Sequence, residues 1–117
     1  MLNRVLALAL AAALALVPLD AAEEAQVTFT KDIAPLIQGK CQECHRPEGL
    51  APFSLITYNQ VRGWSKMIRE VVNEGRMPPW GLDPKVGEWA NDPSFTPEEL
   101  NKLNSWIDGG MAKGDPA

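Results

Sequence analysis

The chain has 117 residues, which is enough for one small domain and too few for two ordinary ones. Hydrophobic residues make up 45% of the sequence and charged residues 22%, proportions that exclude a disordered chain and a polytopic membrane protein. The formal net charge of −4 offers no basic footprint for phosphates, so nucleic acid is excluded as a partner.

The N-terminus has the form of a secretory signal peptide. Met1–Arg4 is a short basic start, and Val5–Val17 is a 13-residue apolar run. Pro18 and Asp20 end this run well short of the roughly 20 apolar residues that a membrane span needs. We therefore predict a signal peptide over residues 1–22 and one domain over residues 23–117, periplasmic or otherwise exported, and soluble after cleavage. An uncleaved anchor is the alternative, and no stable membrane span is expected in the mature chain.

A first helix is predicted directly before the two cysteines. Asp32 is its expected N-cap, which puts Pro35 in the first turn, where proline is tolerated. Its apolar residues follow a helical stripe: Phe29, Ile33, Leu36, Ile37 and Cys41.

Two capping boxes predict the other helices. Thr57–Gln60 begins a middle helix that ends at Gly75, and Thr96–Glu99 begins a last helix that ends at Gly109. The middle helix has the apolar stripe Val61, Trp64, Met67, Ile68, Val71 and Val72, and the last has Leu100, Leu103, Trp106 and Ile107. Trp64 and Trp106 are interpreted as core anchors, and Met67 as a core residue.

Between Gly75 and Phe95 the sequence is rich in Gly and Pro and has neither a helical nor a strand period. A connection of about 20 residues without regular structure is unusual unless it is functional or packs against a ligand. Because no alternating runs predict strands either, the fold is expected to be all-α, with about three main helices and long loops.

The chemistry is concentrated in Cys41–His45, a Cys-x-x-Cys-His run that contains both cysteines and the only histidine. Two thiols at this spacing can form thioether bonds to the vinyl groups of one haem, and the adjacent imidazole then becomes the proximal iron ligand. We predict one covalent haem c, attached through Cys41 and Cys44 and ligated by His45.

A local disulfide and a zinc site are the alternatives to haem. A bridge between Cys41 and Cys44 would close a very short loop and stabilise little. Zinc would find at most three ligands in Cys41, Cys44 and His45, and would need a carboxylate or a partner residue as the fourth.

The axial ligands depend on two further segments. The His45 ring is expected to donate its second N–H to a backbone carbonyl, for which we predict Ala51, held by Pro52. With no second histidine, the distal ligand is predicted to be Met77, which Pro78 and Pro79 stiffen. The other mature methionines are Met67, assigned to the core, and Met111, assigned to a frayed tail.

Tryptophans in the loop are candidates for a second role at the cofactor. The indole N–H groups of Trp80 and Trp89, or the guanidinium of Arg76, are possible donors to a haem propionate, because a carboxylate in a partly apolar crevice needs hydrogen bonds.

These residues resemble a mono-haem class I cytochrome c. The likeness is carried by Cys41–His45, by Met77–Pro78 and by a last helix bearing Trp106, and it covers Val27–Gly114. More narrowly, residues 44–47, 51–55, 76–80, 91–92 and 106–110 look like the small cytochrome c modules found beside larger exported bacterial redox proteins. The resemblance implies a small cytochrome c-like fold, ligation by His45 and Met77, and crossed terminal helices with Trp106 near Ile33 and Ile37.

The function that follows is one-electron transfer between redox protein partners, with His45 and Met77 both ligating the iron and no catalytic residues. The rival from another class is a haem enzyme or gas-binding module, peroxidase-like, with an open or labile distal position. A zinc or disulfide module without haem is the remaining alternative.

Overall fold

The computed structural model describes residues 25–116, and all regular structure within them is helical. The predicted all-α class is therefore confirmed for this range, which contains no strand. The predicted signal peptide lies outside the described residues, and no helix within residues 25–116 is long and apolar enough to cross a membrane. The segments are η1 (Phe29–Ile33), α2 (Ala34–Lys40), α3 (Tyr58–Gly63), α4 (Ser65–Asn73) and α5 (Pro97–Asp108).

The first helix begins earlier than predicted. Thr28, not Asp32, is the N-cap, and the first turn, η1, is a π-helix that continues into α2. Asp32 instead reaches back from inside the turn, where its Oδ2 accepts the Thr28 N–H at 2.9 Å. The wide turn precedes Pro35, which has no N–H to donate and whose ring would crowd the carbonyl four residues earlier, so a π-turn suits this position.

The middle helix is two helices. The Thr57 capping box is confirmed, because the Thr57 Oγ1 accepts the Gln60 N–H and the Gln60 side chain accepts the Thr57 N–H. Regular structure is interrupted at Trp64, with φ −95° and ψ 4°, so that α3 and α4 meet at an angle there. Gly63 and Ser65 flank the break, and such small residues are common at kinks. The predicted terminator Gly75 follows α4 in the left-handed region at φ 70°.

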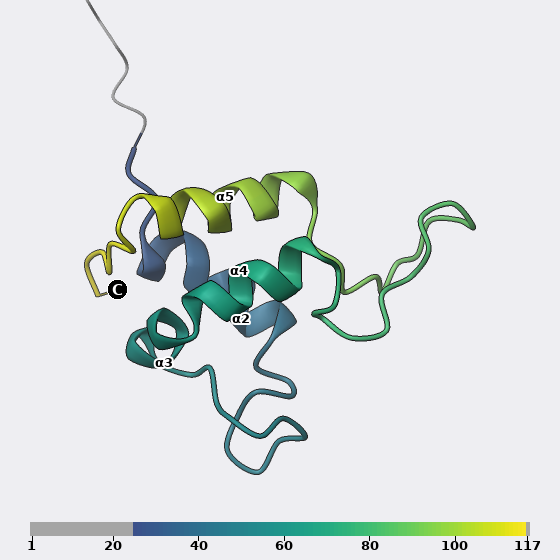
Figure 1. Cartoon of the computed structure of the whole chain (residues 1–117), viewed down its shortest axis with the longest axis horizontal. Coiled ribbons are helices and arrows are strands. Elements are labelled where there is room, and N and C mark those ends of the chain that lie inside the picture. Colours follow the sequence, from purple (N-terminus) through teal and green to yellow (C-terminus); the bar gives the residue numbers. More distant parts are fainter. Residues whose placement is uncertain (1–24, 117) are drawn as a thin grey trace, which may run out of the picture.

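The last helix matches its prediction closely. Thr96 and Glu99 form the capping box, and Pro97 occupies the first helical position. In Figure 1 α5 runs across the other helices and packs against both η1 and α4. Trp106 is 1% exposed and lies 6.0 Å from Phe29 between ring centroids, so the predicted core anchor is confirmed. The buried apolar core comprises Phe29, Ile33, Ile37, Leu55, Val61, Ile68, Val72, Leu103 and Trp106.

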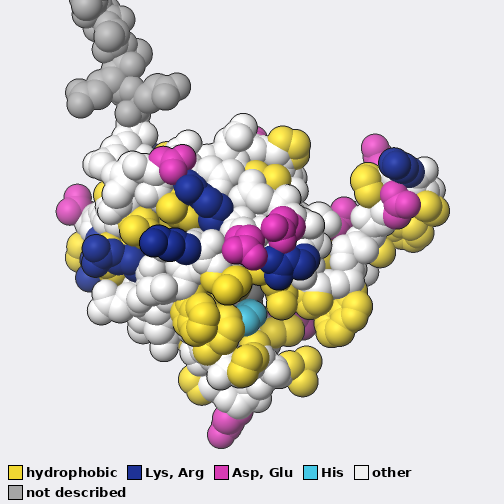
Figure 2. All heavy atoms as spheres, viewed as in Figure 1, with side chains coloured by type: hydrophobic (Ala, Val, Ile, Leu, Met, Phe, Trp, Pro, Cys, Tyr) yellow, Lys and Arg dark blue, Asp and Glu magenta, His cyan; other side chains and the backbone are white. Residues whose placement is uncertain are grey.

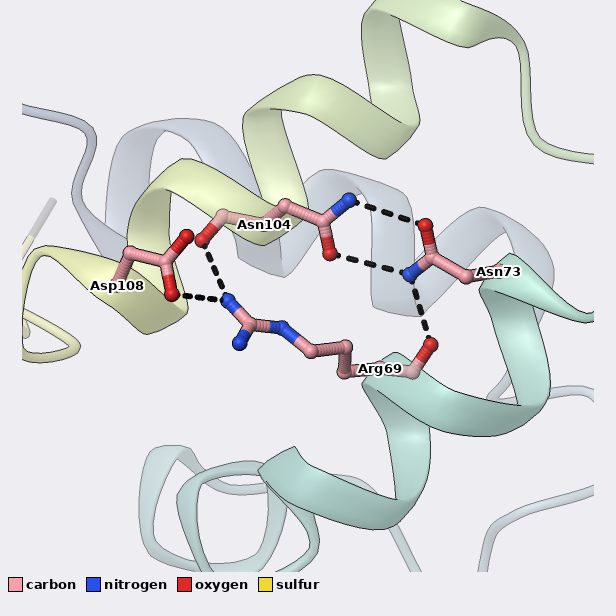
Figure 3. A network of polar contacts seen from close by, with 4 residues as sticks. All are labelled: Arg69, Asn73, Asn104 and Asp108. Carbon is pink, nitrogen blue, oxygen red and sulfur yellow. Dashed lines mark hydrogen bonds and ion pairs between the residues drawn. The ribbon is translucent and has the colours of Figure 1, made fainter.

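Polar side chains join α4 to α5 at the surface (Figure 3). Arg69 donates to the Asn104 carbonyl at 3.1 Å and to the Asp108 carboxylate at 2.5 Å. The amides of Asn73 and Asn104 exchange two hydrogen bonds of 3.1 Å. These bonds fix the register between the two helices over their exposed sides.

Residues after α5 are tied to the start of the first helix. The carbonyls of Ala112 and Lys113 accept the N–H groups of Phe29 and Thr30 at 2.9 and 3.0 Å. The Ala112 carbonyl also accepts the indole N–H of Trp106, and the Met111 carbonyl accepts the Tyr58 hydroxyl, each at 2.9 Å. The tail around Met111 is therefore held in place, and the prediction that it frays is wrong.

The predicted long loop after Gly75 is confirmed as a segment without helix or strand, and Figure 1 shows it running out from the helices and back. Its returning limb is fastened to α2 by Lys40, whose Nζ donates to the Ser94 carbonyl at 2.8 Å and pairs with Glu99 at 3.1 Å. Burial raises the pKa of Glu99, but hydrogen bonds from Thr96 and Lys40 outweigh this and hold it below the usual value.

Candidate functional site

A cavity of about 390 Å³ lies beside the Cys-x-x-Cys-His segment. Its volume falls in the range of roughly 300–1,000 Å³ typical of ligand and cofactor sites. Figure 2 shows the histidine at the bottom of a hollow that is surrounded by hydrophobic side chains. Four segments line it: residues 40–45, residues 50–55, the cavity-facing side of α4 from Trp64 to Val72, and Met77–Trp80. Lys40 is the only charged residue among the lining residues described, so the site suits a largely apolar ligand.

The end of α2 brings the cysteines and the histidine together. Cys41 is the C-cap of α2, and its carbonyl accepts the N–H groups of Cys44 at 3.2 Å and His45 at 2.8 Å. This tight turn leaves Cys41, Cys44 and His45 lining the same cavity, with both cysteines as free thiols. The three residues that the sequence predicts as one site are therefore close together.

Both cysteines are half-buried, and the environment of Cys41 favours the neutral thiol. Burial raises the pKa of Cys41 to about 11, although the nearby charge of Lys40 acts in the opposite direction. A thiol with this pKa is protonated at neutral pH, so Cys41 lacks the thiolate that nucleophilic catalysis needs. Moreover, within residues 25–116 no group of three or more His, Cys, Asp and Glu side chains could hold a metal ion.

The His45 imidazole is oriented by Phe53, not by the predicted Ala51. His45 Nδ1 lies 3.2 Å from the Phe53 carbonyl oxygen. Because a carbonyl can only accept, Nδ1 carries the proton and Nε2 remains for a ligand. The Ala51 N–H instead donates to the Cys44 carbonyl at 3.1 Å. The acceptor therefore lies two residues after the predicted one, on the other side of Pro52.

The 45–55 segment is closed on itself by short-range contacts. The Leu55 N–H donates to the His45 carbonyl at 2.9 Å, and the Gln42 side-chain amide donates to the Leu55 carbonyl at 3.0 Å. A Cβ on Gly49 would lie 2.3 Å from the Cys44 carbonyl oxygen, so only glycine fits there without movement of the backbone. These contacts fix the segment that carries the imidazole.

Trp64 belongs to the site, and its assignment to the core is wrong. Its side chain is 40% exposed and lines the cavity. Its ring stacks on Phe53 with a centroid distance of 4.2 Å and an interplanar angle of 17°. Trp64 lies on the edge of the predicted apolar stripe that faces the cavity, whereas Val61 and Ile68 on the same stripe are buried.

Two methionines line the cavity. Met77, the predicted distal ligand, does so from the loop after α4, and its N–H donates to the Val71 carbonyl at 3.1 Å. Met67 on α4 also lines the cavity and is 47% exposed, so its assignment to the core is wrong. Met111 packs against the core and is not among the lining residues.

The three predicted propionate donors are dispersed. Trp80 lines the cavity with 82% of its surface exposed. Trp89 lies farther along the loop and does not line it. Arg76 is engaged by Glu74 and Glu70, at 2.6 and 2.7 Å. Of the three, only Trp80 is available to a ligand in the cavity.

Comparisons of the chain with protein-family models, with curated proteins and with solved structures found no match. The chemistry of the site must therefore be argued from its own residues. These offer two free thiols, one imidazole with a free nitrogen and two thioethers around an apolar space, a set of groups that could hold a haem.

Proposed function

We propose that this protein is a one-electron carrier with one covalent haem c, in a small cytochrome c-like fold. The observation that carries the proposal is the convergence of Cys41, Cys44, His45 and Met77 on one apolar cavity. Haem bound there by two thioethers supplies reversible ferric–ferrous chemistry.

Each of these residues has a distinct task in the proposal. Cys41 and Cys44, both free thiols, would attach the haem through two thioether bonds. His45, with Nδ1 bonded to the Phe53 carbonyl, offers Nε2 to the iron as proximal ligand. Met77 offers its thioether as distal ligand, which favours the ferrous state and so raises the potential.

The apolar wall supports electron transfer over catalysis. The described lining contains no Asp or Glu, its only histidine is the proposed proximal ligand, and Lys40 is paired with Glu99, so no carboxylate or second imidazole is offered to the distal side. Iron held by both His45 and Met77 would have no position left for a substrate. We therefore propose redox proteins as donor and acceptor, and export as the location, in keeping with the N-terminal sequence.

The test is an absorption spectrum of the protein produced in a host with cytochrome c maturation. We expect the haem to stay with the chain in denaturing extraction. We also expect the native protein to give a low-spin spectrum with a sulfur-to-iron charge-transfer band. Cys41→Ala and Cys44→Ala together should release the haem, and Ser54→Ala, outside the cavity lining, should not. Retained high-spin haem would favour the haem enzyme or gas-binding module, and a colourless protein would refute haem binding altogether.

A further inference from the structure

Three aromatic rings are in successive contact, and the last of them is the imidazole of the proposed proximal ligand. The His45 ring lies 4.6 Å from the Phe53 ring between centroids, with an interplanar angle of 49°. Phe53 in turn stacks nearly parallel on Trp64 at 4.2 Å. Phe53 therefore contacts His45 twice, through its ring and through the carbonyl oxygen that accepts the Nδ1 proton.

The Phe53 carbonyl lies in the one stretch of the 45–55 segment that has no backbone hydrogen bonds of its own. The segment is fastened before Phe53 at Ala51 and after it at Leu55. Pro52 fixes its own φ but has no N–H, and within residues 25–116 the N–H groups of Phe53 and Ser54 donate to no other backbone group. The packing of the Phe53 ring therefore adds a constraint on the direction of the Phe53 carbonyl.

Trp64, by contrast, is held firmly. Its N–H donates to the Gln60 carbonyl at 3.2 Å, and its carbonyl accepts the Ile68 N–H at 2.8 Å. It is the C-cap of α3 and the N-cap of α4, so both helices fix its backbone. Trp64 lies at the break between α3 and α4, and from this fixed backbone its ring stacks on Phe53.

We propose that Trp64 is a positioning residue for the proximal histidine, an inference that rests on the proposed function. By stacking on Phe53, Trp64 holds the carbonyl that accepts the His45 N–H. A hydrogen bond at this nitrogen makes a ligating imidazole a stronger donor, which stabilises ferric iron and lowers the reduction potential. Trp64 thereby sets the potential without contact to the iron.

The experiment compares the reduction potential and the NMR signal of the His45 Nδ1 proton in haem-loaded variants. Trp64→Leu removes the stack and Trp64→Phe preserves an aromatic ring. Trp89→Leu is the matched control, because Trp89 is 46% exposed, against 40% for Trp64, and does not line the cavity. Phe53→Leu removes the same stack from the other side while keeping the backbone carbonyl.

We expect Trp64→Leu to shift the ferric–ferrous equilibrium toward ferrous by up to about tenfold, which for one electron corresponds to about 59 mV. The Nδ1 proton should exchange faster with solvent in the same variant. Trp64→Phe should restore most of both properties, Phe53→Leu should reproduce the shift, and Trp89→Leu should leave both at the wild-type values.

Two outcomes would overturn the inference while leaving the carrier intact. One is a wild-type potential with a protected Nδ1 proton in both Trp64→Leu and Phe53→Leu. The other is an equal shift in Trp89→Leu, which would reflect a general change in polarity. Failure of the wild-type protein to retain haem in denaturing extraction would instead refute the proposed function, and this inference with it.

Discussion

Gly49 provides the sharpest test of the segment that carries His45. An added Cβ would lie 2.3 Å from the Cys44 carbonyl oxygen and 3.0 Å from that of Arg46. Both obstacles are backbone atoms in a turn fixed by hydrogen bonds, so Gly49→Ala must displace the main chain beside Cys44. Because Cys44 and His45 are adjacent, the displacement reaches the proposed attachment site directly.

The magnitude follows from two opposing effects. Overpacking of this kind costs about 1–3 kcal/mol. Alanine also restricts the unfolded chain, which offsets roughly 0.4–1 kcal/mol. The net loss should be about 1–2 kcal/mol, or roughly 5–15 °C in melting temperature for a domain of this size.

The assay is thermal unfolding of Gly49→Ala together with the fraction of chains that retain haem. Gly39→Ala in α2 is the matched control, since a Cβ there would meet nothing within 4 Å. Alanine in a helix should stabilise that variant by up to about 1 kcal/mol. If Gly49→Ala melted at or above the wild-type temperature with full haem content, the reasoning about this turn would be wrong.

Three further predictions concern the ion pair, the distal ligand and the core. Glu99→Gln keeps an acceptor for the Thr96 N–H but loses the pair with Lys40, and should cost about 0.5–1 kcal/mol at pH 7 in urea unfolding. Because the pKa of Glu99 is lowered in the folded protein, its carboxylate adds to the free energy of unfolding above the usual glutamate pKa, and this stabilisation is lost as pH falls through the folded value. The difference in stability between the wild type and Glu99→Gln should therefore shrink toward pH 3. Met77→Ala should convert the haem spectrum from low-spin to high-spin, whereas Met67→Ala should not. Trp106→Phe, which loses buried volume and the bond to Ala112, should cost roughly 2 kcal/mol in chemical denaturation.

For each of these three predictions, one result would contradict the reasoning. A pH-independent effect of Glu99→Gln would mean that its charge contributes nothing. A high-spin spectrum in Met67→Ala and a low-spin one in Met77→Ala would exchange the roles of the two methionines. Wild-type stability in Trp106→Phe would show that the indole hydrogen bond and the lost volume are compensated.

The sequence predicted those features of the structure that depend on residues close together in the chain. The capping boxes at Thr57 and Thr96 need only residues three positions apart, and both occur in the structure. The cysteines and His45 share one cavity because their spacing follows a helix end. Trp106 faces the core because α5 is regular over its whole length.

The errors arise where longer-range geometry overrides periodicity. Trp64 and Met67 fit the apolar stripe, but they lie on the edge of it that faces the cavity and not on the buried side. The acceptor for His45 depends on how the 50–55 segment folds back, which no spacing rule specifies. Asp32 was misassigned because a π-turn before Pro35 moves the helix start to Thr28.

The bonds between Thr30 and the Lys113 carbonyl span 83 residues of sequence. The first turn of the helix that leads to Cys41 therefore lacks these partners until residues 112 and 113 have folded back onto it. Contacts so distant in sequence form late, because most of the chain must be ordered at once to close them. We expect the cysteines to remain accessible until this closure, so the proposed attachment of haem would have time to precede it.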